Sequence, residues 1–163
     1  MERREAVSSK SPPDINVLEI ADWFLAKAKS EHKPLKHMKL QKLVYFAYGW
    51  YYAYYDQPLF GEEIYAWRHG PVVAELYHKY KCYKDNPIAE NIEPQTFAEN
   101  VASILDGTWQ AYEQYSDIQL SAITHRDDSP WAHAYDPDEW YTVIPAESIR
   151  DYFKALRQKY NND

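Results

Sequence analysis

The stretch "LQKLVYFAYGWYYAYY", residues 40–55, decides the fold of this chain. Eight of the eleven residues from Tyr45 to Tyr55 are aromatic, in a chain of 163 residues with a net charge of −7. We therefore expect a central helix that begins near Met38. At 100° per residue its apolar side chains form a stripe that predicts a buried face: Leu40, Leu43, Val44, Ala47, Tyr51 and Tyr54.

A second aromatic stripe lies beside the first on the same predicted helix. It consists of Tyr45, Tyr48, Tyr52 and Tyr55. A helix that is apolar over so wide an arc is usually packed on two sides, which favours a core role for these rings. The tyrosine hydroxyl needs a partner or water, so the stripe also fits a protein interface. The sequence leaves both interpretations open.

Capping sequences predict where further helices begin. The segments 16–19, 96–99 and 116–119 each have the spacing of a capping box, in which the first and fourth residues cap each other. Ser129 followed by Pro130 fits an N-cap and a first helical position. Gly107 is expected to weaken or interrupt the helix that opens at 96–99.

Two short segments, 64–67 and 140–144, are rich in β-forming residues and are expected to pair. Between them, Pro71 is expected to open a helix that runs to about Tyr83. Residues 1–13 are rich in charge, Ser and Pro and predict a disordered tail. The predicted fold is mainly α, a single compact helical domain over residues 14–160 with a small two-stranded β element.

Composition and charge narrow the classes of function. No apolar run reaches the length of a membrane span, and no apolar segment follows the charges of residues 1–16 as in a secretory signal. The lone Cys82 excludes an internal disulfide, so we expect a cytoplasmic protein. Residues 1–84 hold 13 Lys+Arg and 10 Asp+Glu (+3), whereas residues 85–163 hold 5 and 15 (−10). Phosphate backbones repel such an acidic half, so neither nucleic acid nor membrane is an expected partner.

One cluster has residue types that could support catalysis. Five side chains that can bind metal or move protons fall within twelve residues: His125, Asp127, Asp128, His133 and Asp136. Their spacing matches no strong metal signature, and carboxylates in such segments usually form turns and caps. A metal-dependent hydrolase that uses this cluster is the enzymatic alternative.

Other catalytic signals are weak. His78 and Cys82 stand four residues apart, a spacing that would place a thiol near an imidazole on a regular helix, and Ser121 precedes His125 by the same interval. The chain contains four glycines in all, too sparsely placed for a phosphate-binding loop. We therefore expect a binding protein rather than an enzyme, with no cofactor and no metal.

Three separated motifs, in this order, resemble the Panacea-domain family, which includes phage-associated proteins and antitoxins of the SocA type. The resemblance covers the chain from about Ile15 to Leu156. The first motif, "LQKLVYF", contributes Leu40, Lys42, Leu43, Tyr45 and Phe46. The second, "WRHGPV", contributes Trp67, Gly70, Pro71 and Val72. The third, "THRDDSPW", contributes Thr124, His125, Pro130 and Trp131.

The resemblance implies an antitoxin of a bacterial or prophage toxin–antitoxin system, which neutralises a toxin encoded by an adjacent gene by binding it. Some toxins of the family are translation-blocking enzymes that resemble alarmone synthetases. A second implied role is that of an adaptor that delivers the toxin to a Clp protease, for which the tail would be the flexible docking segment. The residues expected to bind the partner are Tyr48, Tyr52, Tyr55, Arg68 and His69.

Overall fold

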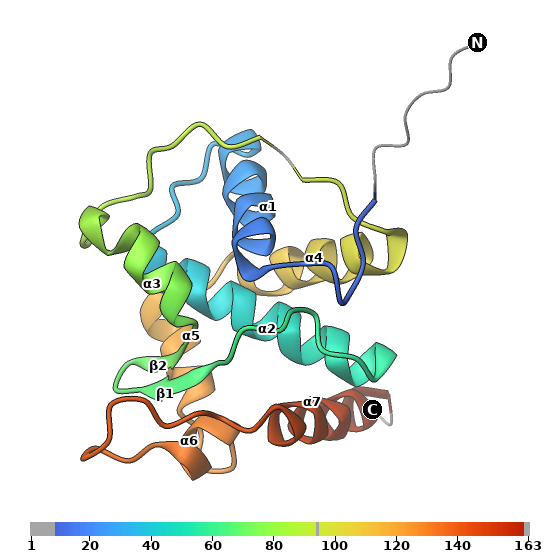
Figure 1. Ribbon diagram of the computed structural model, residues 1–163, viewed down its shortest axis with the longest axis vertical. Helices are drawn as coiled ribbons and strands as arrows, with labels where there is room; N and C mark the ends of the chain where they lie inside the picture. The colour runs from blue at the N-terminus through green and yellow to red at the C-terminus, as the bar shows by residue number, and fades with distance from the viewer. Residues whose placement is uncertain (1–8, 94, 162–163) are drawn as a thin grey trace.

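The computed structural model describes residues 9–93 and 95–161, and α2 (His37–Tyr55) crosses its centre (Figure 1). Thirteen of the nineteen residues of α2 are buried, which confirms the predicted central helix. The helix also contacts the β-hairpin described below. Five further helices in the described part of the chain pack around it: α1 (Val17–Ser30), α3 (Ala74–Tyr80), α4 (Glu99–Tyr112), α5 (Asp117–Thr124) and α7 (Ala146–Asn161).

The helix α7 packs directly against α2 at Gly49. A Cβ atom placed on Gly49 would lie 2.3 Å from ring carbons of Phe153, so only glycine leaves room for this ring. Phe153 is buried and also meets the rings of Tyr45, Phe46 and Trp50 edge-on. Part of the aromatic density of α2 therefore forms the core against α7.

The β element is a hairpin of β1 (Tyr65–Trp67) and β2 (Gly70–Val72). The strands are antiparallel, with Trp67 opposite Gly70. The predicted pairing of 64–67 with 140–144 is confirmed in part, because Ala66 N donates to Thr142 O and Ile144 N to Ile64 O, each at 2.8 Å. The predicted helix is present, but its predicted start at Pro71 is wrong: residues 70–72 pair with β1 as a strand, and the helix begins at Ala74.

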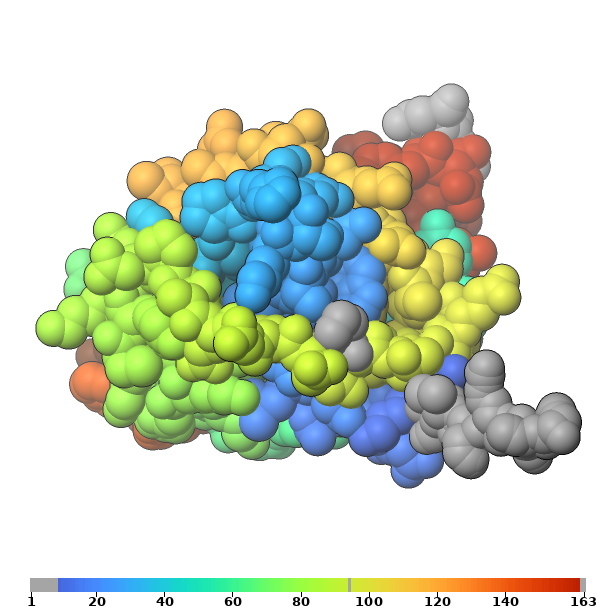
Figure 2. Space-filling view, turned by 90° about the horizontal axis from the view of Figure 1, so that it is seen from above, coloured from blue at the N-terminus to red at the C-terminus, as the bar shows by residue number. Residues whose placement is uncertain are grey.

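After the hairpin, α3 (Ala74–Tyr80) leads into a 3-10 turn, η1 (Lys81–Tyr83). The space-filling view shows the following chain running across the face that carries α1 (Figure 2). There Ile88 N donates to Leu35 O at 2.9 Å, and Lys29 Nζ to Asn91 Oδ1 at 3.2 Å. This connection thus covers one end of α1.

The capping boxes at 16–19 and 116–119 are present as predicted, and Ser129 caps α6 (Pro130–Ala134). The box predicted at 96–99 is wrong, because α4 begins at Glu99 and its N-cap, Ala98, makes no side-chain cap. Residues 96–98 are instead drawn into a short bridge, in which Ala98 N donates to Lys10 O at 2.8 Å.

The predicted interruption of α4 at Gly107 is also wrong. The helix continues through it, because Thr108 and Trp109, which follow Gly107 in α4, are buried.

Residues 1–8 of the predicted tail lie outside the described residues, whereas Lys10 forms an ion pair with Glu19. No helix in the described part of the chain combines the length and apolarity that crossing a membrane requires. The fold is mainly helical with one small two-stranded sheet, as predicted.

Candidate functional site

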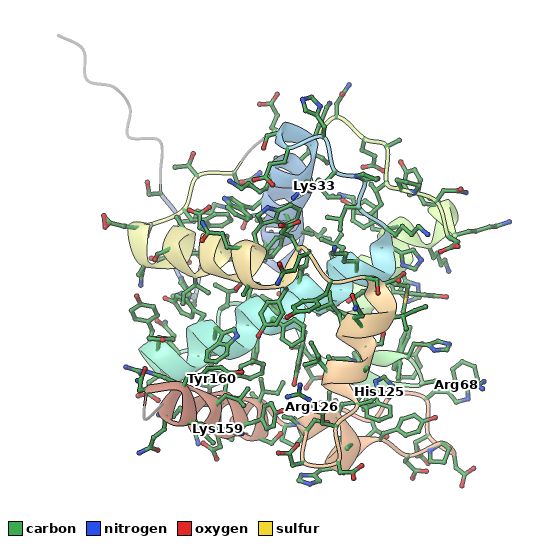
Figure 3. The ribbon with its side chains drawn as sticks, turned by 180° about the vertical axis from the view of Figure 1, so that it is seen from behind. Lys33, Arg68, His125, Arg126, Lys159 and Tyr160 are labelled. Carbon is green, nitrogen blue, oxygen red and sulfur yellow. The ribbon has the colours of Figure 1, made fainter. Side chains whose placement is uncertain are left out.

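The turn between β1 and β2 consists of Arg68 and His69, whose side chains are both exposed. Gly70 follows with φ of +122°, a conformation that side chains other than glycine rarely adopt. Figure 3 shows Arg68 at the edge of the molecule, directed away from the body. The hairpin thus projects a basic turn from an acidic protein.

The carbonyl groups of Trp67, Arg68 and His69 each lie within hydrogen-bonding distance of a side chain from the third motif or from the helix before it. Trp131 Nε1 donates to Trp67 O at 2.6 Å, and His125 Nε2 lies 3.2 Å from Arg68 O. Ser121 Oγ donates to His69 O at 3.4 Å. Backbone carbonyl oxygens accept hydrogen bonds from side-chain donors. The side chains of α5 and α6 therefore hold the backbone of residues 67–69 in place.

The local sequence explains how α5 and α6 reach these positions. Ser129 Oγ donates to Thr124 O at 2.8 Å and accepts from Ala132 N at 3.1 Å, which joins the end of α5 to the start of α6. The rings of His125 and Trp131 are then brought to 3.9 Å between centroids. The spacing of His125 and Trp131 in the third motif therefore places both side chains where they contact the hairpin.

The first motif supports the hairpin from below. Lys42 is fully buried, and a Cβ atom on Gly70 would lie 2.8 Å from its Cε and 3.3 Å from its Nζ. Among the described residues, Lys42 Nζ has no hydrogen-bond partner. Burial lowers the pKa of Lys42 to about 8, and the negative charge of Asp117 opposes this shift.

Gln41, the neighbour of Lys42, holds the end of the hairpin. Its Nε2 donates to Val73 O at 3.1 Å, and its Oε1 accepts from Val73 N at 2.9 Å. Gln41 is buried, so this pair satisfies both backbone groups where β2 turns into α3. Residues of all three motifs therefore pack together around the hairpin. The part of this arrangement that is exposed to solvent is the turn at Arg68 and His69.

A hollow of about 470 Å³ lies beside this turn. Trp140 and Tyr141 project from it with 82% and 59% of their surfaces exposed. The ring of Tyr141 packs edge-on against Trp67 at 6.0 Å. We call this region the hairpin-tip surface and define it by Arg68, His69, Tyr135, Trp140 and Tyr141, all of which line the hollow.

The structure separates the residues that the sequence predicted as one binding patch. Tyr48 is 4% exposed and packs on Phe60, so it belongs to the core and cannot meet a partner. Tyr52 is half-buried beneath Arg150, and Tyr55 is exposed. Tyr55 is also thirteen residues beyond Lys42 on α2. At 1.5 Å per residue this is about 20 Å from the point where the hairpin packs.

The prediction of a single patch is therefore corrected. Arg68 and His69 lie at one end of α2, while Tyr52 and Tyr55 lie at the other. Trp140 and Tyr141, which complete the hairpin-tip surface, were predicted as strand residues. The acidic turn before them, "DPDE", was the one available signal that Trp140 follows an exposed loop.

The geometry does not favour the catalytic alternatives. Both ring nitrogens of His125 lie near main-chain carbonyl oxygens, with Nδ1 2.6 Å from Ser121 O. Asp136 Oδ1 accepts from Asp138 N at 2.9 Å, which is a turn role. Within residues 9–93 and 95–161, no three His, Cys, Asp or Glu side chains converge as metal ligands. Cys82 lies beyond the end of α3, so it does not share a regular helix with His78.

Fold and site together define a small helical domain that presents a braced, aromatic and basic β-hairpin. The sequence model of the family described as "Antitoxin SocA-like, Panacea domain" matches residues 40–132, more than half of the chain. The chain belongs to this family.

A relative of established name is antitoxin SocA of Caulobacter vibrioides (strain NA1000 / CB15N), which is 31% identical over 78 residues. The match covers 48% of this chain and 40% of the relative, so this chain aligns with less than half of that protein. No solved structure matches.

Proposed function

We propose that this chain is the antitoxin of a type II toxin–antitoxin system and neutralises its toxin by direct binding. The observation that carries the proposal is the hairpin-tip surface, in which an exposed Trp and Tyr stand beside an exposed Arg. Trp, Tyr and Arg are the residues most enriched at binding hot spots. The membership of the antitoxin family supplies the class of partner.

The bracing of the turn supports binding rather than catalysis. Immobilising a loop before a partner arrives lowers the entropy lost on binding, so a preformed turn binds more tightly than a mobile one. The hydrogen bonds from Trp131 and Ser121 to the carbonyl groups of residues 67 and 69, together with the packing of His125 beside the carbonyl of residue 68, supply this immobilisation. The motif residues of the family thus support the turn, while Arg68 and His69 remain available to the partner.

Charge supports a protein partner with acidic groups at this point. The turn carries Arg68, and His69 and His78 line the same hollow. Asp136 and Glu139 also line it. A lining that carries charges of both signs contributes more to specificity than to affinity. A partner whose charges do not match this pattern is repelled. We propose that the toxin, encoded by an adjacent gene, presents a carboxylate to Arg68 and an apolar pocket to Trp140.

Co-expression in a bacterial host tests the proposal. The product of the adjacent reading frame is expected to stop growth alone, and the wild-type chain is expected to restore it. The double variant Arg68→Ala, Trp140→Ala is expected to be produced at the wild-type level and to fail in rescue. Ile118→Ala is the matched control, since Ile118 is 79% exposed on α5 outside the hairpin-tip surface. Equal rescue by the double variant would refute the assignment of this surface.

A further inference from the structure

A second concave surface lies on the side of α2 that faces α4 and α7. It has a volume of about 680 Å³, and its lining includes Tyr45, Phe46 and Trp50 of α2. We call it the aromatic groove and define it by these residues together with Tyr54, Tyr112, Tyr115, Arg126, Tyr152, Arg157 and Tyr160. Along α2 its lining runs from Tyr45 to Tyr55, which is about 15 Å at 1.5 Å per residue.

Exposed apolar side chains are concentrated at this groove and at the hairpin tip. Six large hydrophobic side chains are exposed in the described part of the chain. Two of them, Trp140 and Tyr141, belong to the hairpin-tip surface. Three others line the aromatic groove, with exposures of 46% for Tyr54, 44% for Tyr55 and 59% for Tyr160. On soluble proteins exposed apolar residues are usually scattered singly. A cluster of them therefore indicates an interaction site.

The charge of the groove lining is opposite to the net charge of residues 85–163. Residues 85–163 contain five Lys and Arg against fifteen Asp and Glu, yet two of those five, Arg126 and Arg157, line the groove. Among the described residues that line it, none is Asp or Glu. Neither arginine forms an ion pair with a carboxylate within the described chain. An anionic group that enters the groove therefore meets two cations, with no Asp or Glu among the described residues of the lining.

The two arginines occupy different places. Arg126 belongs to the turn between α5 and α6, and Figure 3 shows it directed toward the space between α2 and α7. Arg157 lies on α7 with its guanidinium carbon 4.1 Å from the ring centroid of Tyr54, in a cation–π contact. A compact polyphosphate requires several donors converging on one point. Two guanidinium groups carried by different elements, over an aromatic lining, fit a peptide that bears more than one carboxylate.

We propose that the aromatic groove is a second docking site, which takes a short polypeptide segment of a partner protein. The segment has aromatic or aliphatic anchors at its centre and Asp or Glu toward its ends. A length of about 15 Å corresponds to four or five extended residues or to a helix of about ten. The inference is independent of the hairpin-tip surface and does not require that the partner be a toxin.

Selection from a phage-displayed library of random twelve-residue peptides tests this inference. The wild-type chain is expected to enrich peptides in which Asp or Glu flank an aromatic or aliphatic centre. The best of these peptides, made synthetically with a fluorophore, is expected to bind Arg126→Glu, Arg157→Glu at least ten-fold more weakly. The variant is expected to enrich peptides with Lys or Arg at the same places. Arg126→Glu alone, at an exposed position, repeats the test without disturbing the Tyr54 contact.

Arg150→Glu is the matched control, because Arg150 also lies on α7 but outside the groove lining. It is expected to bind the selected peptide as the wild type does. Three outcomes would each overturn the proposal: no enrichment by the wild type, enrichment of peptides without acidic residues, or equal binding by wild type and both groove variants. Loss of peptide binding in Arg68→Ala, Trp140→Ala would assign the peptide to the hairpin tip and would also overturn it.

Discussion

The indole nitrogen of Trp131 donates a 2.6 Å hydrogen bond to the carbonyl oxygen of Trp67, 64 residues earlier in the chain. This bond joins the last residue of the third motif to the first residue of the second. Trp131 is 8% exposed, so the bond lies largely away from water. It is the shortest of the three side-chain contacts from α5 and α6 to the carbonyl groups of residues 67–69.

Trp131→Phe keeps an aromatic ring but removes the donor. A buried carbonyl left without its partner costs about 1–3 kcal/mol, so the free energy of unfolding is expected to fall by that amount. Urea denaturation followed by circular dichroism measures it. Trp140→Phe is the control, because its ring is 82% exposed and the change is expected to stay within about 0.5 kcal/mol. Equal midpoints for the two variants would contradict the bracing role of Trp131.

Lys42 gives the fold a pH dependence of known sign. Burial lowers the pKa of Lys42 from 10.5 to about 8, so between these values the unfolded chain binds more protons than the folded one. The free energy of unfolding of the wild type therefore rises as the pH is raised from about 8 to 10.5. Conversely, this contribution to stability is present above pH 10.5 and is lost as the pH falls to about 8. At pH 7 the buried charge destabilises the fold on the order of 3 kcal/mol.

Lys42→Met removes this charge and keeps most of the side-chain volume. At pH 7 the variant is expected to be more stable than the wild type by about 1–3 kcal/mol, since a buried unpaired charge is replaced by apolar atoms. The gain is expected to shrink as the pH is raised from about 8 to 10.5. Urea unfolding of both proteins at several pH values measures the difference. A difference that stays constant with pH would contradict this account of Lys42.

Gly70 and Gly107 are expected to respond to alanine with opposite signs. Gly70→Ala forces a side chain into φ of +122° and against Lys42 Cε at 2.8 Å, so it is expected to destabilise the fold by about 2–4 kcal/mol. Gly107→Ala meets no atom within 4 Å inside α4, so higher helix propensity is expected to stabilise by about 1 kcal/mol. Thermal or urea unfolding of the pair checks both. Destabilisation of similar size at both positions would contradict the argument.

The sequence predicted those parts of the fold that depend on local pattern. The central helix follows from the apolar period of residues 40–54, and the boxes at 16–19 and 116–119 follow from side chains that cap their own helix. The helix start at Pro71 was mispredicted because residues 70–72 pair with β1, and strand pairing outweighs the local preference of Pro71 for the first turn of a helix. The box at 96–99 failed for the same reason, since Lys10 takes the backbone of residues 96 and 98.

The candidate site was predicted only where exposure follows from a turn. Arg68 and His69 are exposed, as loop residues after a strand were expected to be, although the loop is a hairpin turn and not the predicted strand-to-helix corner. Tyr48 was mispredicted because its burial depends on Phe60, which reaches it only after the chain folds back from the end of α2. Trp140 was missed because composition alone cannot distinguish an exposed aromatic from one that pairs within a strand.

The proposed binding of a toxin through the hairpin-tip surface can be measured by titration calorimetry with the purified product of the adjacent reading frame. The wild type and Ile118→Ala are expected to form the same stable complex. Arg68→Ala and Trp140→Ala are each expected to raise Kd about 30-fold, equivalent to about 2 kcal/mol at a hot spot. Absence of any complex with the wild type, or wild-type affinity in both hairpin-tip variants, would contradict the proposal.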